Sequence, residues 1–416
     1  MKSKPIASTL FLKNRTRLAS LMPAGSLALI RSGRPKVRSG DQFYPFRAHS
    51  DFFYLTGMDL EDSVLLFAPG HAEPRLRELL FIKRPDPKSG IWTGHPPGPD
   101  EIRVRTGIDE IRWLDEQEAI LQMLLPDAPV IYTDHKLPDL KGSPSMEQKL
   151  SALSPLLQEL RMIKQTEEIQ VIEKAIDITG SAFRRVLRKA VPGIYEYQLE
   201  AEIIGEFIGR GATGHAFEPI VACGKNALVL HYVTNNSLCG EGELLLMDFG
   251  AEVNHYSADC SRTIPISGRF TGRQRQLYDA VLRVFKRARE MMVPGVLMDD
   301  FHRAVGEIWE GEHIGLGLYT REEAKAHAKT DPLWKKYFMH GTSHSLGLDV
   351  HDPFNRMQPF EAGMVLTCEP ALYIREENLG IRLENDILIT KQGPVDLMED
   401  IPIEPDEIEE LMNRTR

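Results

Sequence analysis

The stretches VPGIYEYQLE (residues 191–200) and VPGVLMDDFH (residues 293–302) begin with the same tripeptide, 102 residues apart. Each follows a run of helical spacing, over residues 166–190 and 272–292, and each precedes another helical pattern, from about residue 197 and from residue 299. Proline and glycine end helices, so each tripeptide marks a stop between two helices. A helix, stop and helix repeated at this distance predicts a domain built from two similar halves.

The apolar runs around these helices predict the sheet that they cover. Strands are expected over residues 244–249, 258–266, 364–374 and 380–390. Thr166, followed by two glutamates, is expected to cap the first long helix. The simplest assembly is an α+β domain in which two pairs of helices cover an antiparallel sheet.

The chain before residue 155 follows a different pattern. Short β-like runs at residues 27–31, 64–67, 79–82 and 130–132 alternate with helical patterns, which predicts an α/β domain. The segment KLPDLKGSPSMEQKLSALS (residues 136–154) is rich in Lys, Pro, Gly and Ser and interrupts the pattern. We therefore expect an N-terminal α/β domain over residues 1–154 and a second domain over residues 155–416.

Composition narrows the classes of function. The 416 residues carry a net charge of -10 without a basic run, which argues against nucleic acid or an anionic membrane as the main partner. No apolar run approaches the roughly 18 residues of a membrane span, and the N-terminus does not match a signal peptide. The four cysteines show no C-x-x-C spacing, which indicates reduced thiols and a cytoplasmic protein.

Acidic residues interrupt or end the apolar runs of the second domain, where ionised carboxylates are costly. They are Asp248, Asp259, Glu369 and Glu384. Salt bridges to Arg262 and Arg382 are the simplest explanation, but two arginines do not neutralise four carboxylates. Two divalent metal ions would neutralise them, because carboxylates bridge metal ions about 3.5–4 Å apart.

The segment FMHGTSHSLGLDVHD, residues 338–352, adds three of the chain's 13 histidines, His340, His344 and His351, and ends on Asp352. A single histidine is more often a core or loop residue than a ligand. The spacing of the first two fits an H-E-x-x-H zinc helix, but Gly, Thr and Ser lie between them, without a glutamate. Histidines that function here must converge from a strand and a loop. With His344, the oxygen-rich set favours Mn2+ or Co2+, without excluding Zn2+.

The order of these residues resembles the pita-bread metallopeptidases. The matching motifs are MDFG, DCSRT, HGTSHSLGLDVHD, TCEPALYI and GIRLEND. VLHYV around His231 and FYPFRAHSDFFYLTG (residues 43–57) are similar to Xaa-Pro aminopeptidase, also called aminopeptidase P, and the likeness covers nearly the whole chain. The resemblance implies a pita-bread C-terminal domain with two pseudo-symmetric halves.

The resemblance also implies a role for each ligand. Asp248 would hold one metal ion, His344 and Glu369 the other, and Asp259 and Glu384 would bridge them. A water bridging the two ions would become the nucleophile, and Glu369 would pass a proton to the leaving nitrogen. The expected reaction is hydrolysis of the bond between an N-terminal residue and proline.

Further residues are assigned by the same resemblance. His231 and His351 would contact the scissile carbonyl and the residue after it, Arg382 belongs to the catalytic group, and His340 either binds substrate or makes a structural hydrogen bond.

In the N-terminal domain, Asp41 and Trp92 match residues that reach an active site, sometimes that of a neighbouring subunit. The expected partners are peptides with proline at the second position and further copies of the chain, in a homodimer or homotetramer.

Some features depart from the family pattern. The segment after Glu369 is short, and Asn235 and Asn236 stand where relatives often carry an acid. Cys260 and Cys368 lie beside two ligands, but their strand neighbours point to the opposite face, so we expect them to pack in the core.

Three alternatives to the aminopeptidase reading stay open. Prolidase shares both domains and all five ligands. A creatinase-like hydrolase that needs no metal, or an inactive binding homologue, would typically have lost some of these ligands.

Overall fold

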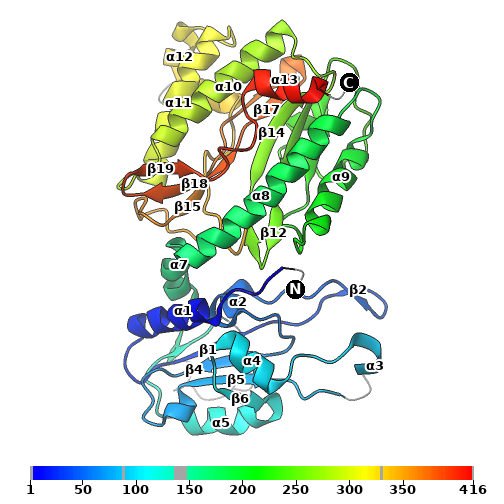
Figure 1. Ribbon diagram of the computed structural model, residues 1–416. Helices are drawn as coiled ribbons and strands as arrows, with labels where there is room; N and C mark the ends of the chain where they lie inside the picture. Colours follow the sequence, from blue (N-terminus) through cyan, green and yellow to red (C-terminus); the bar gives the residue numbers. More distant parts are fainter. Residues whose placement is uncertain (1–2, 87–89, 135–147, 328–330, 415–416) are drawn as a thin grey trace. The chain divides into compact units, whose positions relative to one another are not determined.

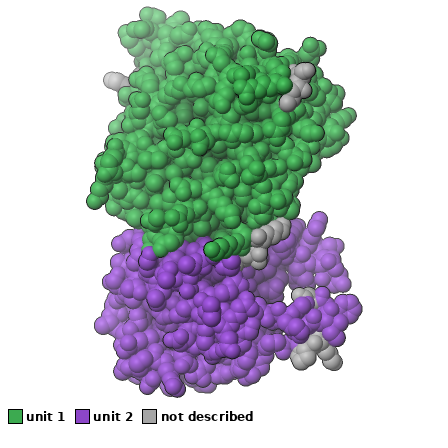
Figure 2. All heavy atoms as spheres, viewed as in Figure 1, with its two compact units in different colours: residues 1–4, 161–416 green, residues 5–160 purple. Residues whose placement is uncertain are grey.

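The computed structural model describes residues 3–86, 90–134, 148–327 and 331–414. Contacts divide the chain into two compact units (Figure 2): unit 1 contains residues 1–4 and 161–416, and unit 2 contains residues 5–160. The predicted boundary, between residues 154 and 155, falls at the start of helix α7 (Ser154–Met162). Among the described residues, no helix combines the length and apolar character that crossing a bilayer requires.

Unit 2 is built on a mixed six-stranded sheet with the order β6-β5-β4-β1-β7-β8. Figure 1 shows four of these strands, β1, β4, β5 and β6. The strands are β1 (Leu27–Arg31), β4 (Val64–Phe67), β5 (Glu78–Ile82), β6 (Glu110–Trp113), β7 (Ile131–Tyr132) and β8 (Leu150–Ser151), with the separate hairpin β2 (Val37–Ser39) and β3 (Gln42–Phe43). The helices are α1 (Ser8–Leu21), α2 (Ser50–Thr56), α3 (Gly90–Thr93), α4 (Pro99–Thr106) and α5 (Gln117–Leu124). The predicted α/β architecture is confirmed.

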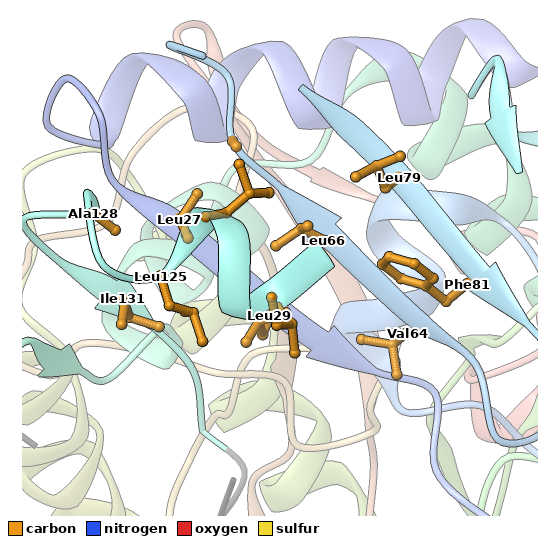
Figure 3. Packing of buried hydrophobic residues seen from close by; sticks show 12 residues of the cluster. Leu27, Leu29, Val64, Leu66, Leu79, Phe81, Leu125, Ala128 and Ile131 are labelled. Carbon is orange, nitrogen blue, oxygen red and sulfur yellow. The ribbon is translucent and has the colours of Figure 1, made fainter. Parts of the chain in front are cut away.

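The core of unit 2 follows from the two-residue period of its strands. Alternate residues of β1, β4 and β5 point to one face and pack against α5 and the turn after it (Figure 3). The buried members are Leu27, Leu29, Val64, Leu66, Ala68, Leu79, Phe81, Leu121, Leu124, Leu125, Ala128 and Ile131. Burial of these apolar side chains, at about 25 cal/mol per Å², stabilises the sheet and the helix together.

Unit 1 contains the two predicted helix pairs. The helices are α8 (Thr166–Lys189), α9 (Glu196–Gly209), α10 (Gly272–Glu290), α11 (Met298–Gly315), α12 (Arg321–His327) and α13 (Pro405–Asn413). Helix α8 packs on α9, and α10 packs on α11. The expected cap at Thr166 is wrong by one residue: Gln165 is the N-cap, and its N–H donates to Glu168 Oε2 at 2.8 Å.

The two VPG stops have the same structure. Gly193 and Gly295 have φ values of 87° and 93°, in the left-handed region that glycine adopts at no steric cost. The Gly193 N–H donates to the carbonyl of Cys239 (2.8 Å), and the Gly295 N–H donates to that of Phe360 (2.9 Å). In return, the Cys239 N–H donates to the carbonyl of Ile194, and the Phe360 N–H donates to that of Val296, each at 2.8 Å. We call residues 166–265 the first half and residues 272–396 the second half.

The strands of unit 1 form small antiparallel sheets, ordered β10-β11-β14, β13-β12-β9, β15-β18-β19 and β16-β17. The first half holds β9 (Gly214–His215), β10 (Ile220–Cys223), β11 (Leu244–Phe249), β12 (Ala251–Val253), β13 (Tyr256–Ser257) and β14 (Cys260–Pro265). The second half holds β15 (Val365–Cys368), β16 (Ala371–Ile374), β17 (Leu379–Arg382), β18 (Asn385–Thr390) and β19 (Gly393–Asp396).

Two of the expected strands are wrong in their continuity, and a third is shorter than expected. The strand expected over residues 258–266 begins at residue 260, after a break from β13. Those expected over residues 364–374 and 380–390 are each divided in two, because β15 pairs with β18 whereas β16 pairs with β17. Pro370, which has no N–H, lies at one of these divisions. Apolar continuity predicted where the strands lie but not where they exchange partners.

Candidate metal centre

A pocket of about 540 Å³ in unit 1 gathers all the residues of the second domain that were predicted to form the site. They are His231, Asp248, Asp259, His340, His344, His351, Glu369, Arg382 and Glu384. The rest of the lining is mainly apolar, from Phe217, Ile220, Leu230, Val233 and Val350, with Glu218, Gly341 and Ser343. A pocket with a polar group at one side and apolar walls is typical of a small-ligand or peptide site.

The carboxylates lie where the strands end or break. Asp248 is next to last in β11, and Asp259 lies between β13 and β14. Glu369 lies between β15 and β16, opposite Glu384 between β17 and β18, since the flanking registers pair Cys368 with Asn385. At a break, a side chain is free of the sheet's alternation, so acids from four strands can point into one space.

Close approach of the chain also requires a glycine here. A Cβ on Gly250, which follows β11, would lie 1.7 Å from the carbonyl oxygen of Ala258. Only glycine therefore allows the segment before Asp259 to pass so close to the end of β11.

The donor atoms of Asp259, His344 and Glu384 lie within 4.8 Å of one another. His344 Nε2 is 3.4 Å from Asp259 Oδ2 and 3.8 Å from Glu369 Oε1. The opposite ring nitrogen, Nδ1, is 3.1 Å from the carbonyl of Ser345, to which it can donate only when protonated. This bond favours the tautomer that leaves the Nε2 lone pair for a metal ion.

The electrostatics of this set call for a cation. Burial, reinforced by the charge of Asp248, raises the pKa of Asp259 well above its usual range. Burial and the charge of Asp259 do the same to the pKa of Glu384, and burial raises the pKa of Glu369 to about 7. Among the described residues, Asp248 Oδ1 and Asp259 Oδ1 are buried without a hydrogen-bond partner. The residues therefore fit a divalent metal.

The two arginines considered as counter-ions behave differently. Arg382 donates to Asp248 Oδ2 at 2.7 Å and through Nε to the Ser261 hydroxyl at 2.7 Å. Arg262 instead donates to main-chain carbonyls, including that of Glu384 at 2.8 Å. Of these two arginines, only Arg382 thus pairs with a candidate-ligand carboxylate, and the shortage of positive charge is greater than the sequence indicated.

A hydroxyl and a phenol that sequence reasoning missed hold the arginine and the ligands. Ser261 donates to Glu384 Oε2 at 2.7 Å, and Arg382 Nη1 donates to the Tyr373 hydroxyl at 2.8 Å. A signal existed for Ser261, because it is two residues after Asp259 and strand neighbours two apart share a face. Alternation from Glu369 also places Tyr373 on the same face, but the contacts of Tyr373 with Arg382 and His340 depend on the β16–β17 pairing.

His340 is engaged at both ring nitrogens. Nδ1 lies 2.8 Å from the carbonyl of Gly341, and Nε2 lies 3.0 Å from the Tyr373 hydroxyl. Burial lowers the pKa of His340 to about 3, with the charge of Arg382 contributing. A neutral His340 ring that donates from Nδ1 accepts a hydrogen bond from the Tyr373 hydroxyl at Nε2. This bond completes a hydrogen-bond chain from Arg382 through Tyr373 to His340.

The other histidines of the pocket are more exposed than the carboxylates. The rings of His344 and His351 stack with centroids 4.1 Å apart and planes inclined by 24°. Burial, then the charge of His344, lowers the pKa of His351 to about 4. His231 is exposed on the loop after β10. Asn235, in the same loop, accepts from the Val221 N–H at 3.0 Å. It is therefore a structural residue of the His231 loop.

Residues outside this set have the following places. Cys260 and Cys368 are fully buried free thiols, so the prediction that they pack in the core is confirmed. Asp41 and Trp92 are exposed residues of unit 2, and Trp92 is 86% exposed. Their expected role at an active site stays a prediction.

Comparison with protein families and known proteins shows the family of the chain. Residues 170–391 match the model of metallopeptidase family M24, and residues 11–132 match the aminopeptidase P N-terminal domain. The chain is 34% identical to the Xaa-Pro aminopeptidase of Escherichia coli K12, over 98% of each protein.

Solved structures agree. Aminopeptidase PepP of Pseudomonas aeruginosa matches with a TM-score of 0.90 at 29% identity, over 99% of each chain. Zinc-substituted E. coli aminopeptidase P in complex with product matches with a TM-score of 0.90 at 32% identity, over 99% of this chain and 100% of that chain. These matches confirm the predicted pita-bread fold and the predicted metal-dependent aminopeptidase.

Proposed function

We propose, because this chain belongs to metallopeptidase family M24 and to the family of Xaa-Pro aminopeptidases, that it removes the N-terminal residue from peptides whose second residue is proline. The observation that carries the proposal is the pocket that joins the buried carboxylates and His344 to His231 and His351. The Xaa-Pro aminopeptidase of E. coli matches 98% of this chain. One solved structure of E. coli aminopeptidase P is a complex with product.

Members of this family bind divalent metal ions. We propose that this chain binds two ions and prefers Mn2+ over Co2+ or Zn2+. Asp248 would hold one ion, His344 and Glu369 the other, and Asp259 and Glu384 both. When bound, the ions supply Lewis-acid polarisation of the scissile carbonyl and lower the pKa of a water.

The chain's own side chains bind the substrate and move the proton. Glu369 lies at the edge of the set, with Oε2 3.5 Å from His340 Nδ1, and would pass a proton to the proline nitrogen. This step is needed because an amide nitrogen leaves only when it is protonated. His231 and His351, at the exposed side of the pocket, would donate to substrate carbonyls. Proline suits such a site because its amide offers no N–H for recognition.

The engagement of Arg382 favours the aminopeptidase over prolidase. A prolidase must bind the free carboxylate of an Xaa-Pro dipeptide, which requires a cation at the far side of the proline pocket. Arg382 donates to Asp248, Ser261 and Tyr373. Those bonds occupy its guanidinium from three directions, so it is not available to close the pocket.

Peptide pairs that differ only at the ends test the proposal. With Mn2+ present, Ala-Pro-Ala is expected to be cleaved at the Ala–Pro bond with a higher kcat/KM than Ala-Pro, and N-acetyl-Ala-Pro-Ala is expected to resist. Preferential cleavage of the dipeptide would assign prolidase instead. Metal analysis covers the creatinase-like and inactive alternatives: fewer than about one ion per chain in Mn2+-supplemented buffer counts against the aminopeptidase.

Three finer assignments belong to the same proposal. The partners are peptides with proline at the second position, and the chain assembles as a homodimer or homotetramer in which Asp41 and Trp92 approach an active site. The free cysteines favour a reducing compartment, the cytoplasm. Light scattering tests the assembly, and a monomeric, fully active enzyme would contradict it.

A further inference from the structure

A group of buried charges lies behind the segment that carries His344 and His351. Asp352, the last residue of that segment, is 6% exposed, and the two cations beside it, Arg161 and Lys164, are 3% and 5% exposed. Arg161 lies at the end of α7, and Lys164 lies in the turn before α8. Buried charges cost several kcal/mol each unless they are paired, so this group must be held by its own contacts.

The contacts converge on the carboxylate of Asp352. Its Oδ1 accepts from Arg161 Nη2 at 2.6 Å and from the Asp349 N–H at 3.1 Å. Its Oδ2 accepts from Lys164 Nζ at 3.2 Å. Arg161 Nη2 also donates to Asp349 Oδ2 at 2.7 Å. Two cations therefore contact two carboxylates, and the carboxylate of Asp352 contacts both cations.

The same carboxylate fills space inside the segment. A Cβ added at Gly347 would lie 2.7 Å from Asp352 Oδ2, so the carboxylate packs directly on the glycine. The Gly347 carbonyl accepts from the Ser257 N–H at 2.9 Å, which ties the segment to the strand before Asp259. The loop is thus closed around Asp352.

One carbonyl connects this group to the metal ligand. The carbonyl oxygen of Ser345 accepts from the Asp352 N–H at 2.9 Å and lies 3.1 Å from His344 Nδ1. Lys164 Nζ is 3.4 Å from the Ser345 hydroxyl. Asp352 is also the chain neighbour of His351, whose ring stacks on that of His344 at 4.1 Å. The positions of the His344 and His351 rings therefore both depend on the position of Asp352.

We propose that Asp352, clamped by Arg161 and Lys164, is a positioning residue for the metal centre, which fixes the ring of His344 for metal binding and the ring of His351 for substrate. Partners that orient a ligand's second nitrogen commonly change metal affinity or activity by about 10–100-fold when removed. Here the orientation is set through a main-chain carbonyl, so the carboxylate acts on the centre without touching it. The proposal rests on the function proposed above.

The experiment replaces Asp352 by asparagine, which keeps the shape and removes the charge. Titration of Mn2+ into the metal-free Asp352→Asn variant is expected to give a Kd about 10–100-fold above that of the wild type, and kcat at saturating Mn2+ is expected to fall by a similar factor. KM for Ala-Pro-Ala is expected to rise by a smaller factor than the Mn2+ Kd, because the His351 ring loses its fixed position but the apolar wall of the pocket is retained.

A double variant separates positioning from stability. Asp352→Asn leaves a buried cation uncompensated and lowers Tm, whereas Asp352→Asn with Lys164→Met removes that excess charge and is expected to recover part of the lost Tm. Kd and kcat are expected to stay impaired in the double variant. Recovery of both together with Tm would overturn the proposal, as would unchanged Kd and kcat in Asp352→Asn.

A matched control comes from unit 2. Glu78 accepts from the buried Arg15 at 2.9 Å, so Glu78→Gln also disturbs a buried arginine. It is expected to lower Tm without changing the Mn2+ Kd. An equal change of Kd in Glu78→Gln would show that general destabilisation weakens the metal centre, and would overturn the proposal. If the wild type fails to cleave Ala-Pro-Ala, the proposed function fails, and the Mn2+ titrations still decide the role of Asp352.

Discussion

The two halves of unit 1 share a framework but divide the chemistry. Both stop a helix at a VPG turn, and the residues that receive the turn, Cys239 and Phe360, are 121 residues apart. The carboxylates Asp248 and Glu369 are separated by the same 121 residues. The first half contributes two aspartates, one near the end of β11 and one at the break before β14, and the second half contributes two glutamates and the histidine-rich segment. The two halves thus repeat the same backbone framework but contribute different residues to the site.

Hydrogen bonds between the two halves hold them together at the site. Arg382 of the second half donates to Asp248 of the first, and Ser261 of the first half donates to Glu384 of the second. The Asp259 N–H of the first half likewise donates to Asp386 of the second at 3.2 Å. Each half therefore orients carboxylates of the other, and the candidate site needs residues from both halves.

The largest effect is expected from loss of a carboxylate shared by both halves. Glu384→Ala should lower kcat/KM by at least about 10³-fold, since Lewis-acid stabilisation of several kcal/mol is lost and each 1.36 kcal/mol is tenfold. Metal content, measured by mass spectrometry after dialysis, should fall with it. Glu410→Ala on α13, where the carboxylate is exposed, is the control and should change neither quantity. Full activity in Glu384→Ala would contradict the ligand assignment.

A smaller effect is expected from the arginine that joins the halves. Arg382→Lys keeps the charge but cannot make all the bonds to Asp248, Ser261 and Tyr373, and should lower kcat/KM by about 10²–10³-fold, as breaking a buried charge pair costs about 3–5 kcal/mol. The loss should be equal for Ala-Pro-Ala and Ala-Pro. A loss confined to the dipeptide would mean that Arg382 binds the substrate carboxylate, and would favour prolidase.

Parts of this arrangement could be predicted from the sequence, and parts could not. The helix pairs followed from 3.6-residue spacing and the VPG stops, and the ligand candidates followed from acids such as Glu369 in apolar runs. The strand breaks could not be predicted, because apolar continuity does not record which strand pairs with which. The role of Tyr373 was equally hidden, since it depends on pairing between β16 and β17.

The two halves also differ in the residue that closes the capping box of their first long helix. The capping box of α8 ends on Glu168, which is 2% exposed, and that of α10 ends on Gln274, which is 5% exposed. Burial raises the pKa of Glu168 to about 7 from an ordinary 4.5. The folded state therefore holds this proton more tightly than the unfolded chain. The free energy of unfolding that Glu168 contributes falls as the pH rises from about 4.5 to about 7.

Glu168→Gln converts the first half to the pattern of the second and removes this titration. Relative to the wild type, the variant should gain free energy of unfolding across the same pH window, by at most about 3 kcal/mol. Chemical denaturation at pH 5 and pH 8 measures the gain. Gln274→Glu in α10 is the reciprocal change and should lose stability as the pH rises. A pH-independent difference between Glu168→Gln and the wild type would show that Glu168 is ionised in the folded state.

The smallest effect tests the equivalence of the two turns. A Cβ added at Gly193 or at Gly295 meets no atom within 4 Å, so alanine at either position carries only the strain of positive φ, about 1–2 kcal/mol. Equal losses of unfolding free energy in Gly193→Ala and Gly295→Ala are expected. Gly205→Ala, inside α9 and also without a neighbour within 4 Å, should instead stabilise by about 0.5–1 kcal/mol. Losses that differ by more than about 0.5 kcal/mol, the scatter of independent sites, would mean that the repeated tripeptide performs different structural tasks in the two halves.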